Sequence, residues 1–305
     1  MAALPPYAGP AGIAWHYGFR VFCGFVLLFL ILPILVIIPL SFNAEPYFTY
    51  SKAMITLQPE AYSWRWYMDI MKNGMAAPNA NMWSWTWLSD SWNNAQWIHA
   101  TKNSFIIAIF STLIATALGT LAALGLTRAH MPFRKLIMAL LISPMIVPLI
   151  ISAAGMFFFY SSIGLSQTFP GIILAHAALG TPFVVITVTA TLAGFDSNLI
   201  RASASLGASP PRTFFKVIVP LISPGVISGG LFAFVTSFDE VVVVLFLTGF
   251  EQRTVTRQMW AGVREQISPT ILAVATLLVL VSILLLTTLE LLRRRNERMR
   301  GMSAQ

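Results

Sequence analysis

The sequence predicts an all-α membrane protein with six transmembrane helices and both ends of the chain in the cytoplasm. Of its 305 residues, 57% are hydrophobic and only 10% are charged, whereas a soluble domain carries roughly 25% charged residues. Five long runs contain no Asp, Glu, Lys or Arg, and the basic residues divide unevenly between the two sides that these runs define. This composition excludes a soluble enzyme and a disordered chain. It also excludes a disulfide scaffold, because the single cysteine cannot form an internal bridge.

The uncharged runs give the positions of the six helices. A bilayer core of about 30 Å requires about 20 apolar residues in a helix. The run 136–195 is too long for one span and fits two helices joined by a hairpin at 161–170, where Ser, Gly and Pro are frequent. None of the runs alternates with period two, as a transmembrane β-strand does. The other runs are 21–44, 103–127, 217–238 and 266–289.

The first apolar run is expected to remain in the protein as a transmembrane helix over residues 20–42, after a cytoplasmic segment at 1–19. A cleaved signal peptide has a basic start, a shorter apolar stretch and a cleavage site with small residues. Residues 1–18 carry no charge, and the only candidate cleavage site, at 41–44, is weak.

The basic residues set the orientation, because short cytoplasmic loops carry an excess of Lys and Arg. With the N-terminus inside, the inside segments hold 12 of the 19 basic residues and three acids, and the outside loops hold seven basic residues and six acids. The high isoelectric point therefore reflects membrane topology, and a nucleic-acid partner is not required.

The first outside loop, residues 43–102, is rich in tryptophan. It is too short for an independent core. One interpretation is an aromatic belt at the level of the lipid headgroups, and the other is a docking surface for an outside partner. The loop holds seven of the nine tryptophans, namely Trp64, Trp66, Trp83, Trp85, Trp87, Trp92 and Trp97.

The inside loop 195–218 predicts a short exposed helix over residues 199–206. Asp196 or Ser197 can cap its start, and Gly207 fits the left-handed position that ends a helix. Small residues at 202–204 would let another protein approach closely. The pair at 210–211 is Pro-Pro and permits a second short helix from Arg212 that returns the chain to the membrane. An ordinary interfacial helix is the alternative.

At this loop the sequence resembles the inner-membrane permease subunits of binding-protein-dependent ABC importers. Their signature is Glu-Ala-Ala, then a Gly three residues further on, and some residues later Ile/Val-x-Leu/Val-Pro. Further segments resemble the spermidine/putrescine group of that family, and together they cover roughly residues 20–295. The matching positions are Arg201-Ala202-Ser203, Gly207, Val217-Ile218-Val219-Pro220, Ser63 to Tyr67, Asn103 to Phe105, Gly119 to Ala123, His176, Pro182 to Val185 and Ser237 to Val244.

The resemblance implies a type I ABC importer permease (MetI-like) fold in the bacterial inner membrane, with a transmembrane core at 103–292 and a basic cytoplasmic tail at 293–305. It implies a second, different permease, two ATPase subunits and a periplasmic substrate-binding protein as partners. The loop helix would couple this chain to an ATPase, and the solute would be a polyamine or a related amine-bearing compound. The expected coupling residues are Leu199, Arg201, Ala202, Ser203, Leu206, Gly207 and Ala208.

Three features depart from the family pattern. Arg201 stands where the signature has Glu, so a salt bridge made by that Glu must differ here. Met145 follows Ser143-Pro144 where polyamine-moving relatives tend to carry an acid. Residues 74–90 look like an insertion.

The acids Asp239 and Glu240 interrupt an apolar stretch, and charge in a membrane usually faces a cavity or a partner. Adjacent helical positions point about 100° apart, so both acids cannot face one site on a helix. By the resemblance, the substrate pathway includes Trp66, Ser237, Asp239 and Glu240. The alternative is a structural pair that caps a helix break or meets an arginine of the partner permease.

No enzymatic activity, metal site or cofactor is expected in this chain. It lacks a G-x-x-x-x-G-K-[ST] phosphate loop, so ATP would bind to the partner ATPases. His176 is expected to hydrogen-bond to a neighbouring helix.

The alternative functions are an ABC importer of the same kind that transports an aminophosphonate, opine, amino acid or ferric iron, an ion-coupled carrier, or a membrane-embedded enzyme. A lone carrier would show inverted repeats, and an enzyme would need convergent nucleophile and base groups.

Overall fold

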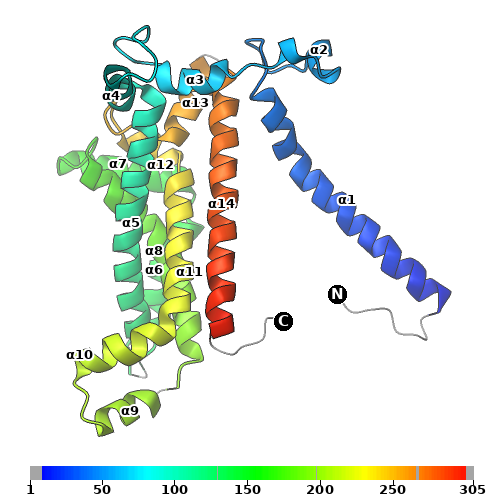
Figure 1. Cartoon of the computed structure of the whole chain (residues 1–305). Coiled ribbons are helices and arrows are strands. Elements are labelled where there is room, and N and C mark those ends of the chain that lie inside the picture. The colour runs from blue at the N-terminus through cyan, green and yellow to red at the C-terminus, as the bar shows by residue number, and fades with distance from the viewer. Residues whose placement is uncertain (1–8, 129, 197, 266–267, 300–305) are drawn as a thin grey trace. The chain divides into compact units, whose positions relative to one another are not determined.

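The computed structural model describes residues 9–128, 130–196, 198–265 and 268–299, which are almost entirely helical (Figure 1). Among these residues the β pairing consists of one isolated bridge, between Asn43 and Tyr62. The chain divides into two compact units, residues 1–73 with 262–305, and residues 74–261. Ser197, a predicted cap, and Gln266, the start of the last run, lie outside the described residues, as do the ends 1–8 and 300–305.

The first unit contains two long helices, α1 (Pro10–Leu40) and α14 (Thr270–Met299). α1 begins well before the predicted residue 20, because Pro10 suits the first position of a helix and the uncharged segment after it continues the helix. The unit also holds α2 (Lys52–Ile55), the 3-10 turn η1 (Pro59–Ala61) and α3 (Arg65–Lys72). The Thr270 hydroxyl donates to the Asp69 carboxylate over 2.7 Å, which fixes α14 to α3.

Three long helices form the centre of the second unit: α5 (Gln96–Leu126), α8 (Phe169–Ala193) and α11 (Val219–Asp239). Glycines allow their close approach, as expected of membrane helices. A Cβ on Gly119 of α5 would lie 2.6 Å from the Val184 Cβ, and one on Gly229 of α11 would lie 2.7 Å from the Val184 Cα. Both neighbours therefore press on the same turn of α8.

The apolar run 136–162 folds as two helices that meet at a sharp bend. α6 (Arg134–Ile146) and α7 (Leu149–Ser162) are inclined at 102° to one another. The cause is Pro148, since the residue before a proline is pushed into extended backbone, and Val147 has ψ 134°. The hairpin predicted at 161–170 is confirmed, because α7 ends at Ser162 and α8 begins at Phe169.

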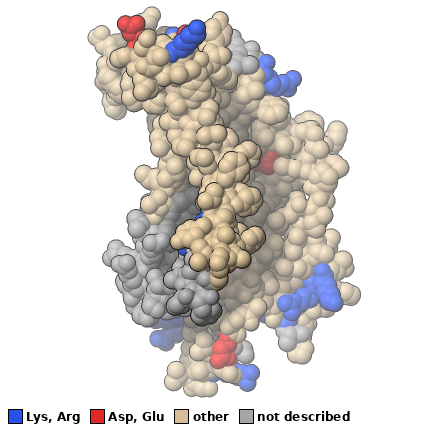
Figure 2. All heavy atoms as spheres, turned by 90° about the vertical axis from the view of Figure 1, so that its right-hand side faces the viewer, with Lys and Arg blue, Asp and Glu red and all other residues tan. Residues whose placement is uncertain are grey.

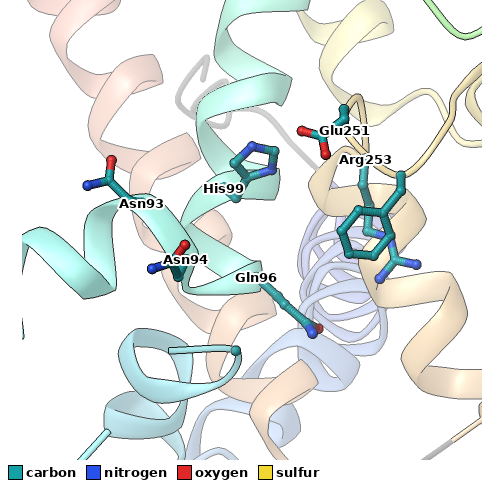
Figure 3. A pocket seen from close by; sticks show the side chains of 8 residues that line it. Asn93, Asn94, Gln96, His99, Glu251 and Arg253 are labelled. Atoms are coloured by element: carbon teal, nitrogen blue, oxygen red, sulfur yellow. The ribbon is translucent and has the colours of Figure 1, made fainter. Parts of the chain in front are cut away.

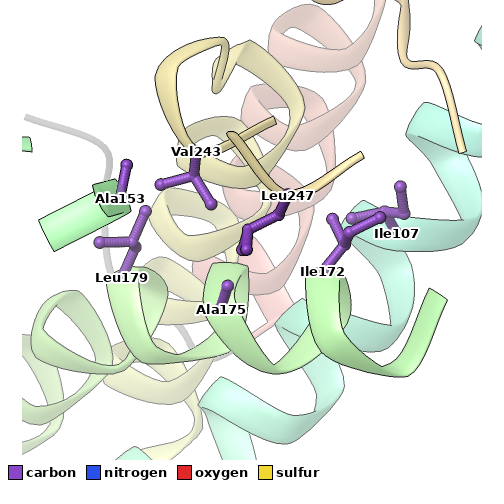
Figure 4. Packing of buried hydrophobic residues seen from close by; sticks show 7 residues of the cluster. All are labelled: Ile107, Ala153, Ile172, Ala175, Leu179, Val243 and Leu247. Carbon is purple, nitrogen blue, oxygen red and sulfur yellow. The ribbon is translucent and has the colours of Figure 1, made fainter. Parts of the chain in front are cut away.

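A buried apolar cluster fixes this bent pair to the central helices (Figure 4). α12 (Val242–Leu247) contributes Val243 and Leu247, which pack against Ala153 of α7 and against α5 and α8. The remaining members are Ile107, Ile172, Ala175 and Leu179.

The two loop regions lie at opposite ends of the second unit (Figure 1). α4 (Trp85–Asn94) precedes α5 at one end. α9 (Asn198–Ser205) and α10 (Pro210–Thr213) lie at the other, and a π-helical turn η2 (Phe214–Ile218) leads from α10 into α11. This arrangement agrees with the predicted outside and inside loops. α13 (Val255–Glu265) follows α12 along the chain.

Four described helices are long and apolar enough to span a membrane, and the bent pair makes a fifth if it counts as one span. The sixth predicted span falls on α14, whose described apolar part is Thr270–Leu284. Many large apolar side chains are exposed, and most of the face in Figure 2 is neither acidic nor basic. The all-α membrane fold is therefore confirmed, while the count of six and the inside position of both ends stay predictions.

Candidate coupling helix and translocation pathway

α9 forms where the sequence predicts a loop helix, at Asn198–Ser205. The Asp196 carboxylate accepts from the Asn198 backbone N–H over 2.9 Å, so Asp196 stabilises the turn that starts the helix. Gly207 has φ +77°, the left-handed conformation expected of the residue that ends a helix. The sequence therefore specifies both ends of α9.

A buried pair of hydroxyls joins α9 to the helix that returns to the membrane. Ser203 Oγ and Thr213 Oγ1 lie 2.7 Å apart, and both side chains are buried. Thr213 ends α10, which continues through η2 into α11. The contact therefore connects α9 directly to the start of a long central helix. Sequence analysis did not identify Thr213, which has no motif of its own.

The outward side of α9 is available to a partner. Leu206 is 88% exposed, and Leu199 is also exposed. Among the expected coupling residues Ser203 is buried and Ala208 is half-buried; the exposed ones are Leu199, Arg201, Ala202, Leu206 and Gly207. Apolar side chains beside small residues on a short, well-ended helix suit insertion into a groove of another protein.

The predicted pathway residue Ser237 is buried between α11 and α8. Its hydroxyl lies 2.8 Å from His176 Nδ1, which confirms the prediction that His176 hydrogen-bonds to a neighbouring helix. The other imidazole nitrogen, Nε2, is buried and has no hydrogen-bond partner among the described residues.

The two acids that end α11 face different surroundings. Asp239 is the last residue of the helix and is exposed, whereas Glu240 is buried. Glu240 Oε1 accepts from the Val243 backbone N–H over 2.9 Å, so it caps α12. Glu240 thus acts at a helix break, as one of the two interpretations expected, and the Asp239 carboxylate is left for another contact.

Trp66, the remaining predicted pathway residue, belongs to the first unit and is buried in it. Its Nε1 donates to the Asn43 backbone carbonyl over 2.6 Å, and the Arg65 guanidinium lies 4.1 Å from the centre of its ring. The structure therefore gives Trp66 a local structural contact. Within the searched part of the chain, no group of three or more His, Cys, Asp or Glu residues could hold a metal ion.

Residues 115–298 match the family described as the binding-protein-dependent transport system inner membrane component. The chain belongs to this family. It is 29% identical over 268 residues to the spermidine/putrescine transport system permease protein PotC of Haemophilus influenzae, covering 88% of this chain and 93% of that protein. It is 31% identical over 208 residues to PotC of Escherichia coli K12, covering 68% and 79%.

The fold is also similar to a solved structure, that of a bacterial ABC transporter involved in the import of the acidic polysaccharide alginate. The TM-score is 0.67 and the sequence identity 13%, with 95% of this chain and 99% of that chain covered. The similarity supports the ABC permease fold. Together with the apolar helices, the family match makes this chain a multi-pass membrane permease.

Proposed function

We propose that this chain is one of two permease subunits of an ATP-driven importer in the bacterial inner membrane, and that its solute is a polyamine or a related amine-bearing compound. The observation that carries the proposal is α9, a short helix with an exposed apolar side that Ser203 and Thr213 join to a membrane helix. A helix joined in this way can transmit movement to the membrane helix only if a partner protein moves it.

The partner of α9 would be an ATPase subunit, since this chain lacks a phosphate loop. Closure of two ATPases would move α9 and switch the permease pair between inward-facing and outward-facing states, a rigid-body transition between two packings. A soluble binding protein would deliver the solute from outside.

The polyamine assignment draws on the names of the relatives and on one carboxylate. Asp239 is exposed at the end of α11 while Glu240 is engaged in capping α12. Within the described residues no hydrogen bond or ion pair engages the Asp239 carboxylate, and a carboxylate in an apolar membrane segment attracts a cationic amine. Ser237 would act by supporting this region, because it is buried and hydrogen-bonded to His176, whereas Trp66 would act within the first unit, where it is hydrogen-bonded to Asn43.

Uptake by the reconstituted transporter tests the proposal. Proteoliposomes would contain both permeases and the ATPases, with the binding protein outside and ATP inside. ATP-dependent accumulation of labelled spermidine or putrescine is expected. Accumulation of an aminophosphonate, opine, amino acid or ferric iron instead would support the importer assignment and refute the polyamine assignment. Uptake by this chain alone without nucleotide would refute the importer assignment.

A further inference from the structure

Two phenylalanines from neighbouring membrane helices stack on one another two turns before the end of α11. The ring centres of Phe183 in α8 and Phe232 in α11 lie 6.0 Å apart, and the ring planes are inclined at 20°. Phe183 is half-buried, whereas Phe232 is 54% exposed. The close packing of the two helices holds the pair in place, since a Cβ on Gly229 would lie 2.7 Å from the Val184 Cα. The stack therefore presents a fixed aromatic face.

Phe232 lies on the same side of α11 as Asp239. Both residues belong to one helix, and their seven-residue separation is about 700° of rotation, about 20° short of two full turns, with a rise of about 10.5 Å. Val235 lies between them on this side and is 60% exposed. Ala233 and Ser237 point elsewhere and are buried. One exposed side of α11 thus carries an acid and, two turns away, an aromatic ring.

The acid indicates what this side of α11 borders. Asp239 is exposed, and a charge exposed to lipid is costly, so charged groups in membrane segments usually face a cavity or a partner. Because Phe232 shares the side of Asp239, its ring borders the same space. α11 runs from α10 towards the end of the second unit that carries α4 (Figure 1), so Phe232 lies further from that end than Asp239 does.

The chemistry and spacing of the two groups suit a molecule with an amine at each end. A ring face attracts an ammonium group within about 6 Å of its centre. An extended chain spans about 1.2 Å per bond, because a residue of three backbone bonds spans about 3.3–3.6 Å. The terminal nitrogens of spermidine are separated by nine bonds, or about 11 Å, and those of putrescine by five bonds, or about 6 Å. Spermidine therefore matches the rise of about 10.5 Å between the two residues.

The pocket at the outer end of the second unit is less suited to an amine (Figure 3). It has a volume of about 360 Å³, and Phe250, Glu251 and Arg253 belong to its lining. The Arg253 guanidinium lies 5.3 Å from the centre of the Phe250 ring and occupies that aromatic face. Its charge also opposes an incoming amine beside Glu251.

Asp90, an acid of α4, is engaged in local structure. Asn94 Nδ2 donates to its carboxylate over 2.6 Å, and the Ala77 backbone N–H donates over 2.8 Å. These bonds, that from Asn94 most of all, lower the pKa of Asp90 below its usual value. The Asp90 carboxylate thus stabilises the segment before α4, unlike that of Asp239.

We propose that Phe183 and Phe232 form an aromatic subsite that receives one amine of a polyamine while the Asp239 carboxylate receives the other. The inference rests on the proposed function, which places a polyamine beside Asp239. A solute long enough to reach both groups is held at two points, whereas a short diamine is held at one. The aromatic pair would therefore favour spermidine over putrescine during translocation.

The experiment uses proteoliposomes with both permeases, the ATPases and the solute-loaded binding protein. Phe232→Leu removes the ring and keeps an apolar side chain. It is expected to lower the initial rate of spermidine uptake about fivefold and that of putrescine less than twofold, with stimulated ATP hydrolysis retained. Phe183→Leu is expected to act in the same direction, and Phe232→Tyr, which keeps the ring, is expected to preserve the wild-type ratio of the two rates.

Phe110→Leu is the matched control, because Phe110 is 52% exposed on another long helix, α5. Its ratio of spermidine to putrescine uptake is expected to equal that of the wild type. An equal loss of both solutes in Phe232→Leu would assign the ring a purely structural role and overturn the subsite, as would unchanged rates for both; either result would leave the importer assignment intact.

The remaining outcomes separate this proposal from the proposed function. A wild type that imports putrescine but not spermidine would overturn the two-point contact and keep the polyamine assignment. A wild type that imports neither polyamine would overturn both. Loss of copurification with the second permease in Phe232→Leu would show that the partner covers this side of α11, which would refute the subsite.

Discussion

The contact between Ser203 and Thr213 gives the sharpest test of how α9 is connected to the membrane. Ser203→Ala removes one hydroxyl and leaves the other buried without its partner. An unsatisfied buried polar group costs about 1–3 kcal/mol, and about 1 kcal/mol corresponds to a factor of about five in an equilibrium. The population with α9 detached from α10 is therefore expected to rise about fivefold or more.

The assay is the number of solute molecules imported per ATP hydrolysed in proteoliposomes. Ser203→Ala is expected to lower this ratio severalfold, because α9 would move without carrying α11 along. ATP hydrolysis is expected to remain stimulated, because α9 would still sit in the groove of the ATPase. Ser203→Thr keeps the hydroxyl and is expected to restore most of the coupling.

Ser205→Ala supplies the matched control. Ser205 is exposed, and its hydroxyl donates to the Arg201 carbonyl within α9, so the same atom is removed without touching α10. An unchanged transport ratio in Ser203→Ala would refute the reasoning, as would an equal loss in both variants.

Four further outcomes are expected. Asp239→Asn should abolish uptake without loss of assembly, measured by labelled polyamine in proteoliposomes; normal uptake would remove its carboxylate from the pathway. Arg201→Glu should weaken stimulation of the ATPase if the partner's groove is acidic, and unchanged transport would count against that groove. Gly229→Ala should lower stability by about 1–3 kcal/mol through overpacking, measured by thermal unfolding in detergent, whereas Gly155→Ala, where a Cβ meets nothing within 4 Å, should not. Since the folded pKa of Asp90 is lowered, its stabilising contribution is present above the unfolded pKa and is lost as pH falls through the folded pKa; hydrogen exchange in segment 74–90 should rise on acidification, and a pH-independent rate would contradict this.

The sequence was sufficient for the fold class because one physical quantity, the length of an uncharged apolar run, decides whether a helix can cross a bilayer. It also placed both ends of α9, since Asp196 and Gly207 act on their own neighbours. Pro148 in the long apolar run indicated a kink, which the structure confirms. The angle of 102° between α6 and α7 could not be predicted, because the length of an apolar run says nothing about the direction in which the next helix leaves.

Contacts between distant residues were beyond sequence reasoning for a different reason. The partner of Ser203 depends on how α9 turns relative to α10, and that of Ser237 depends on the rotation of α8 against α11. The presence of His176 in an apolar span showed that some partner was needed, because a buried imidazole requires one, but not which one. For Glu240 the sequence left a pathway role and a helix cap open, and only the position of α12 shows that its carboxylate accepts a hydrogen bond from the Val243 backbone N–H.

The course of α11 connects the two predicted sites of action. Residues from Pro210 to Asp239 form a continuous helix of 30 residues, about 45 Å long at 1.5 Å per residue. Thr213 near its start holds α9, and Asp239 ends it. Gly229 packs against the Val184 backbone of α8, so α11 cannot slide far along that neighbour without separating from it, and the two helices must move together. The π-turn η2 and the break at Glu240 are the points where this helix departs from regular geometry, and such turns in helices are frequent at functional sites. A displacement of α9 that passes through η2 would therefore move α8 and α11 together as far as Asp239, and the break at Glu240 is where this movement would end.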